Sequence, residues 1–97
     1  MPTPEDHRIA GNLQVIRQYL ANAFPGCIMT DDRPSPPTHH SFTMTERATG
    51  TRYKLKVAWG KLSDSGNVPE KTMLRLCGDN VAEQMRAAKG EYFYWAG

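Results

Sequence analysis

Cysteine is scarce in this sequence, which has only Cys27 and Cys77 among 97 residues. Two cysteines are too few for the disulfide framework of a small secreted domain. They do not form a CxxC pair, so their spacing gives no support to zinc or redox chemistry. We therefore expect two reduced, buried thiols in a cytoplasmic protein. A single bridge between them is the alternative that the sequence leaves open.

Long hydrophobic runs are missing as well. No apolar segment approaches the roughly 20 residues that a membrane-spanning helix needs. The first residues, MPTPEDHRIAG, contain neither the basic leader nor the apolar core of a secretory signal. With 39% hydrophobic and 23% charged residues, the composition is that of an ordinary globular protein. We expect one small domain over residues 1–97, with no membrane segment.

Signatures of nucleotide binding and catalysis are also absent from the sequence. It contains neither GxGxxG nor GxxxxGK followed by Ser or Thr, the loops that hold nucleotide phosphates. A metal-dependent nuclease would need an acidic residue and a Glu-X-Lys pattern on a strand, yet the strand candidate Thr51–Trp59 has no acidic residue. We therefore expect a protein that is not an enzyme and that uses no cofactor.

The histidines and aspartates before residue 41 are the one candidate metal site. His39 and His40 are adjacent, and Asp31, Asp32 and His7 are the residues that could join them. Adjacent residues of a strand point to opposite faces, so the two histidines make a poor pair of ligands for one ion. We expect surface histidines beside a strand, and no metal.

The segment Ser41–Trp59 has the alternation of a β-hairpin, with one apolar and one basic face. A four-residue turn over 47–50, in which Gly50 takes a positive φ, closes the strands in one register. That register pairs Met44 with Tyr53, Phe42 with Leu55, Thr45 with Arg52, Thr43 with Lys54, and Ser41 with Lys56. Both strands then place apolar residues on the same face, and a shift of one residue would destroy the agreement.

Helical periodicity marks both ends of the chain. An apolar stripe at three- and four-residue spacing predicts a helix that Thr3 caps and that ends at Phe24-Pro25-Gly26; the stripe is Ile9, Leu13, Ile16 and Leu20. A second helix is predicted over 80–89, with Asp79 as its N-cap and Gly90 as its stop.

The remaining segments complete an α+β fold. Residues 27–30 predict a short strand, 31–38 a proline-rich loop, and 61–71 a turn-rich loop. Residues 72–77 predict a further strand, with Leu74 and Leu76 inward, and a helix from Pro69 is the alternative. We expect a three- to four-stranded antiparallel sheet, with an N-terminal and a C-terminal helix packed on one face and a terminal strand as an option.

Positive charge is concentrated on the hairpin. From Arg47 to Lys61 there are five basic residues and no acidic one, although the whole chain carries a net charge of only +2. The rest of the chain has seven basic and ten acidic residues, a balance of −3. The candidate binding residues on this basic face are Arg47, Arg52, Lys54, Lys56, Lys61 and Arg75.

The last residues form an aromatic cluster, Tyr92, Phe93, Tyr94 and Trp95. Alternation would place the two tyrosines on one face and Phe93 with Trp95 on the other. Packing on the core is one interpretation, and a partner or homodimer interface is the other.

These patterns favour a binding or regulatory module over an enzyme. Its partner, met through the basic sheet face, would be a protein, including a component of nucleoprotein machinery. The alternative is a nucleic acid recognised through its phosphate backbone, because phosphate contacts need charge and donors but no particular sequence. A polar sheet face that meets only solvent is also compatible with the pattern.

Overall fold

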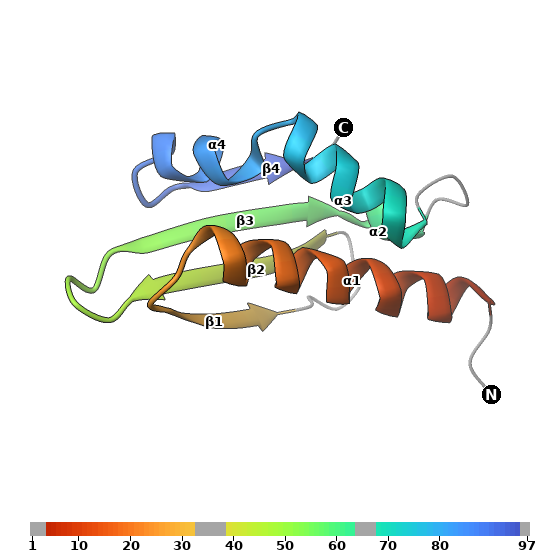
Figure 1. Cartoon of the computed structure of the whole chain (residues 1–97), viewed down its shortest axis with the longest axis horizontal. Helices are drawn as coiled ribbons and strands as arrows, with labels where there is room; N and C mark the ends of the chain where they lie inside the picture. Colours follow the sequence, from red (N-terminus) through yellow and green to blue (C-terminus); the bar gives the residue numbers. More distant parts are fainter. Residues whose placement is uncertain (1–3, 33–38, 64–67, 96–97) are drawn as a thin grey trace.

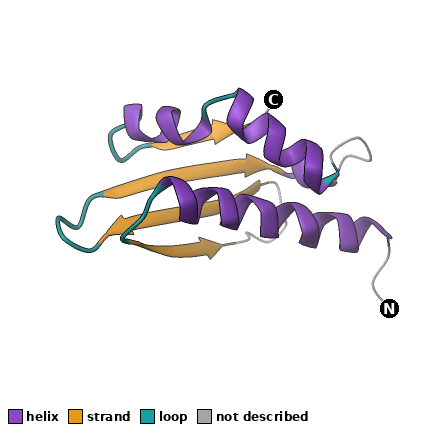
Figure 2. Ribbon diagram, viewed as in Figure 1, coloured by secondary structure: helices purple, strands orange, loops and turns teal. Residues whose placement is uncertain are grey.

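The computed structural model describes residues 4–32, 39–63 and 68–95, which form a four-stranded sheet covered on one face by helices (Figure 1, Figure 2). The elements in chain order are α1 (Pro4–Ala23), β1 (Cys27–Asp32), β2 (His39–Glu46), β3 (Arg52–Ala58), α2 (Trp59–Ser63), α3 (Pro69–Gly78), α4 (Val81–Ala87) and β4 (Tyr92–Trp95). The predicted α+β class, with an N-terminal and a C-terminal helix on one face, is confirmed. The predicted cap Thr3 and most of the proline-rich loop lie outside the described residues. The loop prediction is wrong for its first two residues, Asp31 and Asp32, which extend β1 by pairing with β2.

Three strands of the sheet are antiparallel neighbours, and the fourth is not. β1, β2 and β3 pair antiparallel in chain order, whereas β4 pairs parallel with β3. A parallel neighbour requires a long crossover. Here α2, α3 and α4 carry the chain from the end of β3 back to its beginning (Figure 1). The optional terminal strand therefore exists, and it supplies the fourth position of the sheet.

The predicted hairpin register is confirmed. Phe42 pairs with Leu55, Met44 with Tyr53, and Thr43 with Lys54, as the alternation required. The turn is closed by the Gly50 N–H, which donates to the Glu46 carbonyl at 2.8 Å, and Gly50 has φ +75°. A residue with a side chain is strained at that φ, so the glycine fixes the turn and with it the register.

The prediction of a strand over 72–77 is wrong, because this segment is helical in α3. Pro69 occupies the first turn, where a missing N–H costs nothing. The buried residues are Thr72 and Leu76, four positions apart, whereas Leu74 is 72% exposed. The two-residue spacing of the leucines suggested a strand, but the four-residue spacing of Thr72 and Leu76 is the one that the core uses. The loop predicted over 61–71 is correspondingly interrupted by α2 and by the start of α3.

The core lies between the sheet and the helices, and the predicted apolar faces form it. The stripe of α1 packs against the apolar face of the hairpin. The fully buried members from these two elements and from the crossover are Ile16, Leu20, Phe42, Met44, Leu55, Val57, Leu62, Leu76, Val81 and Met85. None of the helices that the structure describes is both long and apolar enough to cross a bilayer.

A buried amide connects α1 to the crossover. Asn12, on α1, is fully buried, and its Nδ2 donates to the Leu62 carbonyl at 3.0 Å. The Thr72 hydroxyl donates to Asn12 Oδ1 at 2.9 Å, and Thr72 is also buried. One side chain thus joins α1, α2 and α3 inside an otherwise apolar core, where such groups must be paired.

The second predicted helix exists as α4, but Asp79 does not cap it. Asn80 takes the N-cap position with a left-handed backbone, φ 51°. The Tyr19 hydroxyl of α1 instead accepts the Ala82 N–H at 3.0 Å. In return the Arg86 guanidinium of α4 donates to the Ala23 carbonyl in the last turn of α1. Each helix therefore satisfies a terminal backbone group of the other.

Candidate functional site

The uncovered face of the sheet gathers side chains from all four strands. Because successive residues of a strand point to opposite faces, the residues between the buried positions of each strand belong to the uncovered face. We call this surface the open face. Its described side chains are Ile28, Thr30, His39, Ser41, Thr43, Thr45, Arg52, Lys54, Lys56, Ala58, Tyr92 and Tyr94.

Strand β4 brings two tyrosines beside the lysines of β3. The parallel register pairs Lys54 with Tyr92 and Lys56 with Tyr94. The Lys54 and Lys56 ammonium nitrogens lie 5.2 Å and 4.5 Å from the centroid of the Tyr92 ring. Both distances fall within the range of a cation–π contact. We call these four residues the lysine–tyrosine cluster.

The electrostatics of the open face follow from its composition. Arg52, Lys54 and Lys56 lie in one row along β3, and none of the side chains that the structure describes on this face is acidic. Alternate residues of a strand are about 7 Å apart. Two like charges at that separation repel by about 0.6 kcal/mol even in water. Neutral Ser and Thr side chains, as on β2, solvate a sheet without this repulsion.

The other predicted basic residues lie elsewhere. Arg47 is exposed in the turn between β2 and β3, at one end of the sheet. The Lys61 ammonium nitrogen, on α2, lies 4.6 Å from the centroid of the Trp95 ring, which belongs to the core. Arg75 is exposed on α3, in the helical layer, so the prediction that it lies beside the basic row is wrong.

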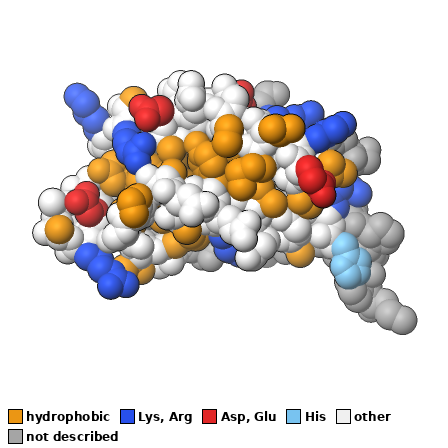
Figure 3. All heavy atoms as spheres, in the orientation of Figure 1, with side chains coloured by type: hydrophobic (Ala, Val, Ile, Leu, Met, Phe, Trp, Pro, Cys, Tyr) orange, Lys and Arg blue, Asp and Glu red, His pale blue; other side chains and the backbone are white. Residues whose placement is uncertain are grey.

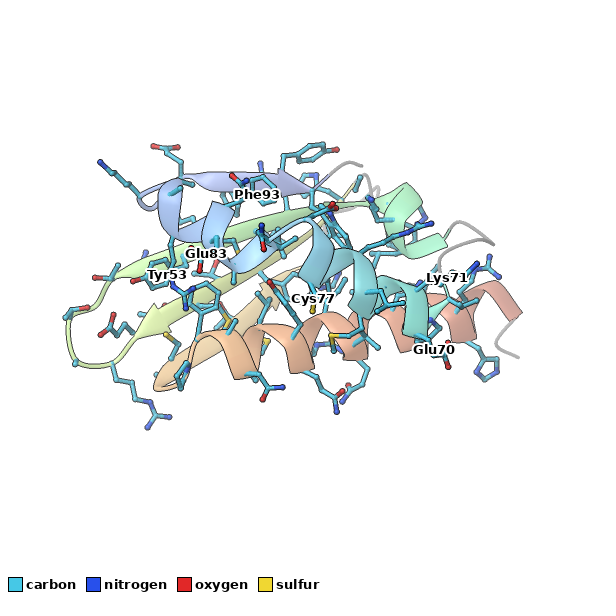
Figure 4. The ribbon with its side chains drawn as sticks, turned by 45° about the horizontal axis from the view of Figure 1, so that its top comes forward. Tyr53, Glu70, Lys71, Cys77, Glu83 and Phe93 are labelled. Atoms are coloured by element: carbon cyan, nitrogen blue, oxygen red, sulfur yellow. The ribbon has the colours of Figure 1, made fainter. Side chains whose placement is uncertain are left out.

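The terminal aromatic residues divide as predicted. Tyr92 and Tyr94 are 41% and 52% exposed, whereas Trp95 is 3% exposed and Phe93 packs against the core (Figure 4). Sequence reasoning treated the basic row and this segment as two separate surfaces. The structure joins them into one, because β4 pairs with β3. The length of the crossover was the only signal that allowed such a parallel pairing.

Both histidines belong to β2, where they lie on opposite faces as adjacent residues must, so the prediction of a surface pair beside the strand is wrong for His40. His40 is buried on the helical side with its ring 4.9 Å from that of Phe42, and His39 belongs to the open face. Among the described residues, no group of three or more His, Cys, Asp or Glu side chains is placed to hold a metal ion. The side chains of Asp31 and Asp32 lie outside the described part of the chain.

The cysteines are both free, and only one of them is sheltered. Cys27 is partly buried at the start of β1, where burial and the nearby Glu46 carboxylate raise its pKa above the usual 9.0, against the opposing charge of Arg86. A raised thiol pKa leaves less of the reactive thiolate, which disfavours a nucleophilic role. Cys77 is exposed on α3, contrary to the prediction of two buried thiols.

The helical face differs in character from the open face. Figure 3 shows hydrophobic side chains gathered across its middle, with charged groups toward its margins. Leu74, on α3, is the most exposed large hydrophobic side chain of the described residues. This face has no row of one charge, so the open face is the better candidate site.

Comparison with known proteins gives no relative from which a role could be transferred: no family model, no curated protein and no solved structure matches the chain.

Proposed function

We propose that this chain is a small, non-enzymatic binding module whose open face holds the phosphate backbone of a nucleic acid. The observation that carries the proposal is the row formed by Arg52, Lys54 and Lys56 on a face without described acidic side chains. Thr43 and Thr45, directly opposite on β2, add hydroxyl donors next to this row. Charge and donors are what phosphate contacts require.

The geometry favours a role for these cations beyond solvation. A solvated face needs polar groups but no single sign of charge, and three neighbouring cations repel one another. A bound polyanion removes that repulsion and releases its own counterions. Release of this repulsion gives a physical reason for three cations to share one strand. The register also assigns the position of Asp32, which pairs with Ser41 on β1, to the open face, two strands away from the row on β3.

An acidic protein surface is the second candidate partner, including one that belongs to a nucleoprotein assembly. The observation in its favour is the pair of exposed tyrosines beside the cations, since Tyr is enriched in protein interfaces. Such a partner would meet the same open face, so the two candidates share their site and differ in their ligand.

The test is binding of a fluorescein-labelled oligonucleotide by polarisation over a range of salt concentrations. Three phosphate contacts predict a slope of about −2 for log K against log salt on a single strand, since each contact contributes about −0.7. The double variant Lys54→Glu plus Lys56→Glu should lose at least tenfold in affinity, because it reverses two of the three charges.

The matched control is Lys71→Glu plus Arg75→Glu. Both residues are exposed on α3 in the helical layer, where Figure 4 labels Lys71, and the control changes the net charge by the same amount. It should retain affinity within about threefold, a loss that reflects long-range field alone. Circular dichroism of each variant checks folding. Equal losses in both double variants, or no binding by the wild-type chain at low salt, would overturn the proposal and leave the acidic protein partner.

A further inference from the structure

The geometry points to single-stranded nucleic acid as the ligand, with one base stacked on Tyr92 and a neighbouring base on Tyr94. This inference rests on the proposed function and names the form of ligand that the same face would take. Four observations carry it: the exposure of the rings, the contacts that anchor their strand, their spacing, and the cations beside them.

The exposure of the tyrosines is selective. β4 has four aromatic residues, of which Phe93 and Trp95 turn toward the core, while Tyr92 and Tyr94 remain 41% and 52% exposed. The two exposed rings lie on the same face as the basic row. Single-stranded nucleic acids bind proteins by stacking their bases on such aromatic side chains within a basic surface.

The strand that carries the rings is held firmly. The Trp95 indole N–H donates to the Asp79 carboxylate at 2.7 Å, at the junction of α3 and α4. The Lys61 ammonium nitrogen lies 4.6 Å from the centroid of the Trp95 ring, and all four residues of β4 pair with β3. A platform that is ordered before binding avoids the entropy cost of ordering it on binding.

The spacing of the two rings suits separated bases. Tyr92 and Tyr94 are alternate residues of one strand, so their Cα atoms are about 7 Å apart. Successive bases of a duplex strand rise by only about 3.4 Å. Two bases that occupy both rings must therefore be drawn apart from each other. A single strand can do this, but a duplex cannot without unpairing.

The cations match the other half of each nucleotide. The Lys54 and Lys56 ammonium groups rest near the Tyr92 ring in the free protein. When a base takes the face of the ring, the flexible lysines turn to the phosphate that joins the two nucleotides and to the phosphate next to it. The lysine–tyrosine cluster thus offers both an aromatic surface and a counter-charge. An acidic peptide would use the lysines but would leave the rings without a planar partner.

The test compares oligo(dT), oligo(U) and a mixed-sequence DNA duplex, each of about 12 nucleotides or base pairs, in the same polarisation assay. We expect the wild-type chain to bind a single strand at least tenfold more tightly than the duplex. The two single strands distinguish DNA from RNA as the source of the same chemistry. Tight binding of either one supports the inference, because ring stacking does not read the sugar.

The decisive variants are Tyr92→Thr plus Tyr94→Thr, compared with Tyr92→Phe plus Tyr94→Phe. Threonine keeps strand propensity but removes the rings. Stacking on an aromatic ring contributes about 5- to 150-fold per base, so the threonine variant should lose at least 25-fold in single-strand affinity. Its salt slope should not change, because the cations remain. The phenylalanine variant keeps both rings and should bind within about threefold of the wild-type chain.

Outcomes that overturn this inference differ from those that overturn the proposed function. Equal wild-type affinity for strand and duplex, or full single-strand binding by the threonine variant, removes the stacking role. In either case the loss caused by charge reversal at Lys54 and Lys56 still supports phosphate binding. Absence of binding to all three probes at low salt removes both.

Discussion

Asn12 shows how strongly one polar side chain bears on this core. Its amide joins the Leu62 carbonyl of α2 to the Thr72 hydroxyl of α3, and it is fully buried. Replacing a paired buried group leaves its partners unsatisfied, which costs more than the hydrogen bonds themselves contribute. The position was not recognisable from the sequence, because an asparagine in an amphipathic helix normally belongs to the polar side.

Asn12→Leu should therefore lower the free energy of unfolding by about 2–4 kcal/mol, although it increases apolar content. Urea denaturation measures the change. Gln14→Leu, an exposed position of the same helix, is the control and should stay within about 0.5 kcal/mol. Thr72→Val should lower the free energy of unfolding less in the Asn12→Leu variant than in the wild-type chain, because its hydrogen-bond partner is already lost. Simple additivity of the two changes would contradict the network.

At the scale of elements, α1 and α3 approach each other at a glycine. A methyl group at Gly11 would lie 2.9 Å from Pro69 Cγ, closer than carbon atoms pack. The pyrrolidine ring cannot rotate away as a flexible side chain would. The glycine therefore allows the start of α3 to pack closely against α1, next to the buried pair Asn12 and Thr72.

Gly11→Ala should destabilise the chain by about 1–3 kcal/mol, since the overlap outweighs the better helix propensity of alanine. Gly78→Ala is a matched control, because a methyl group there meets nothing within 4 Å. It should leave stability unchanged or raise it by up to about 1 kcal/mol. Thermal unfolding of both variants gives the comparison, and a stabilised Gly11→Ala would show that the two helices move apart at little cost.

How well each element could be predicted depended on how local its signal was. Register in the hairpin follows from alternation and from Gly50, both of which lie within twenty residues, and it is correct. The segment over 72–77 carries both a two-residue pattern, Leu74 and Leu76, and a four-residue pattern, Thr72 and Leu76. Only the packing against α1 decides between them. Asp79 had the right chemistry for a cap, but Trp95 recruits its carboxylate from a distant part of the chain.

The two parts of the candidate site, the basic row and the exposed tyrosines, could each be predicted from the sequence. The basic row followed from the hairpin, and the alternation of exposed and buried aromatic residues followed from the terminal segment. Their position side by side could not be predicted, because it depends on a parallel pairing between two strands, β3 and β4, that three helices separate in the chain. Arg75 was assigned to the basic face because its segment was predicted as a strand, and Lys61 because it follows the hairpin, yet the crossover takes both away from this face.

In the whole molecule, β4 is the element most dependent on contacts made elsewhere. It is a four-residue edge strand that pairs only with β3 within the described sheet, and Asp79 holds its last residue through the indole of Trp95. A hydrogen bond to a charged group contributes about 1.5–3 kcal/mol. Loss of this hydrogen bond should therefore destabilise β4 before it destabilises the rest of the sheet.

Asp79→Ala should accelerate amide hydrogen exchange in β4 while leaving the β2–β3 pairs protected, because local opening requires less free energy than global unfolding. It should also weaken single-strand binding, although residue 79 is not on the open face. Asp79→Asn retains an acceptor oxygen, so its exchange rates in β4 should lie between those of the wild-type chain and those of Asp79→Ala. Uniformly faster exchange in all strands would indicate global destabilisation and would contradict a local role for this hydrogen bond.

Because β4 pairs parallel with β3, the complete open face exists only in the folded chain. Lys54 and Lys56 come from the middle of the chain and the tyrosines from its last strand, with the whole crossover between them. In an unfolded chain the lysines and the tyrosines are too far apart to contact the same nucleotide. A ligand that needs both binds the native state alone, and by mass action its presence raises the melting temperature. The fold assembles the open face, and a nucleic acid bound there would in turn stabilise the fold.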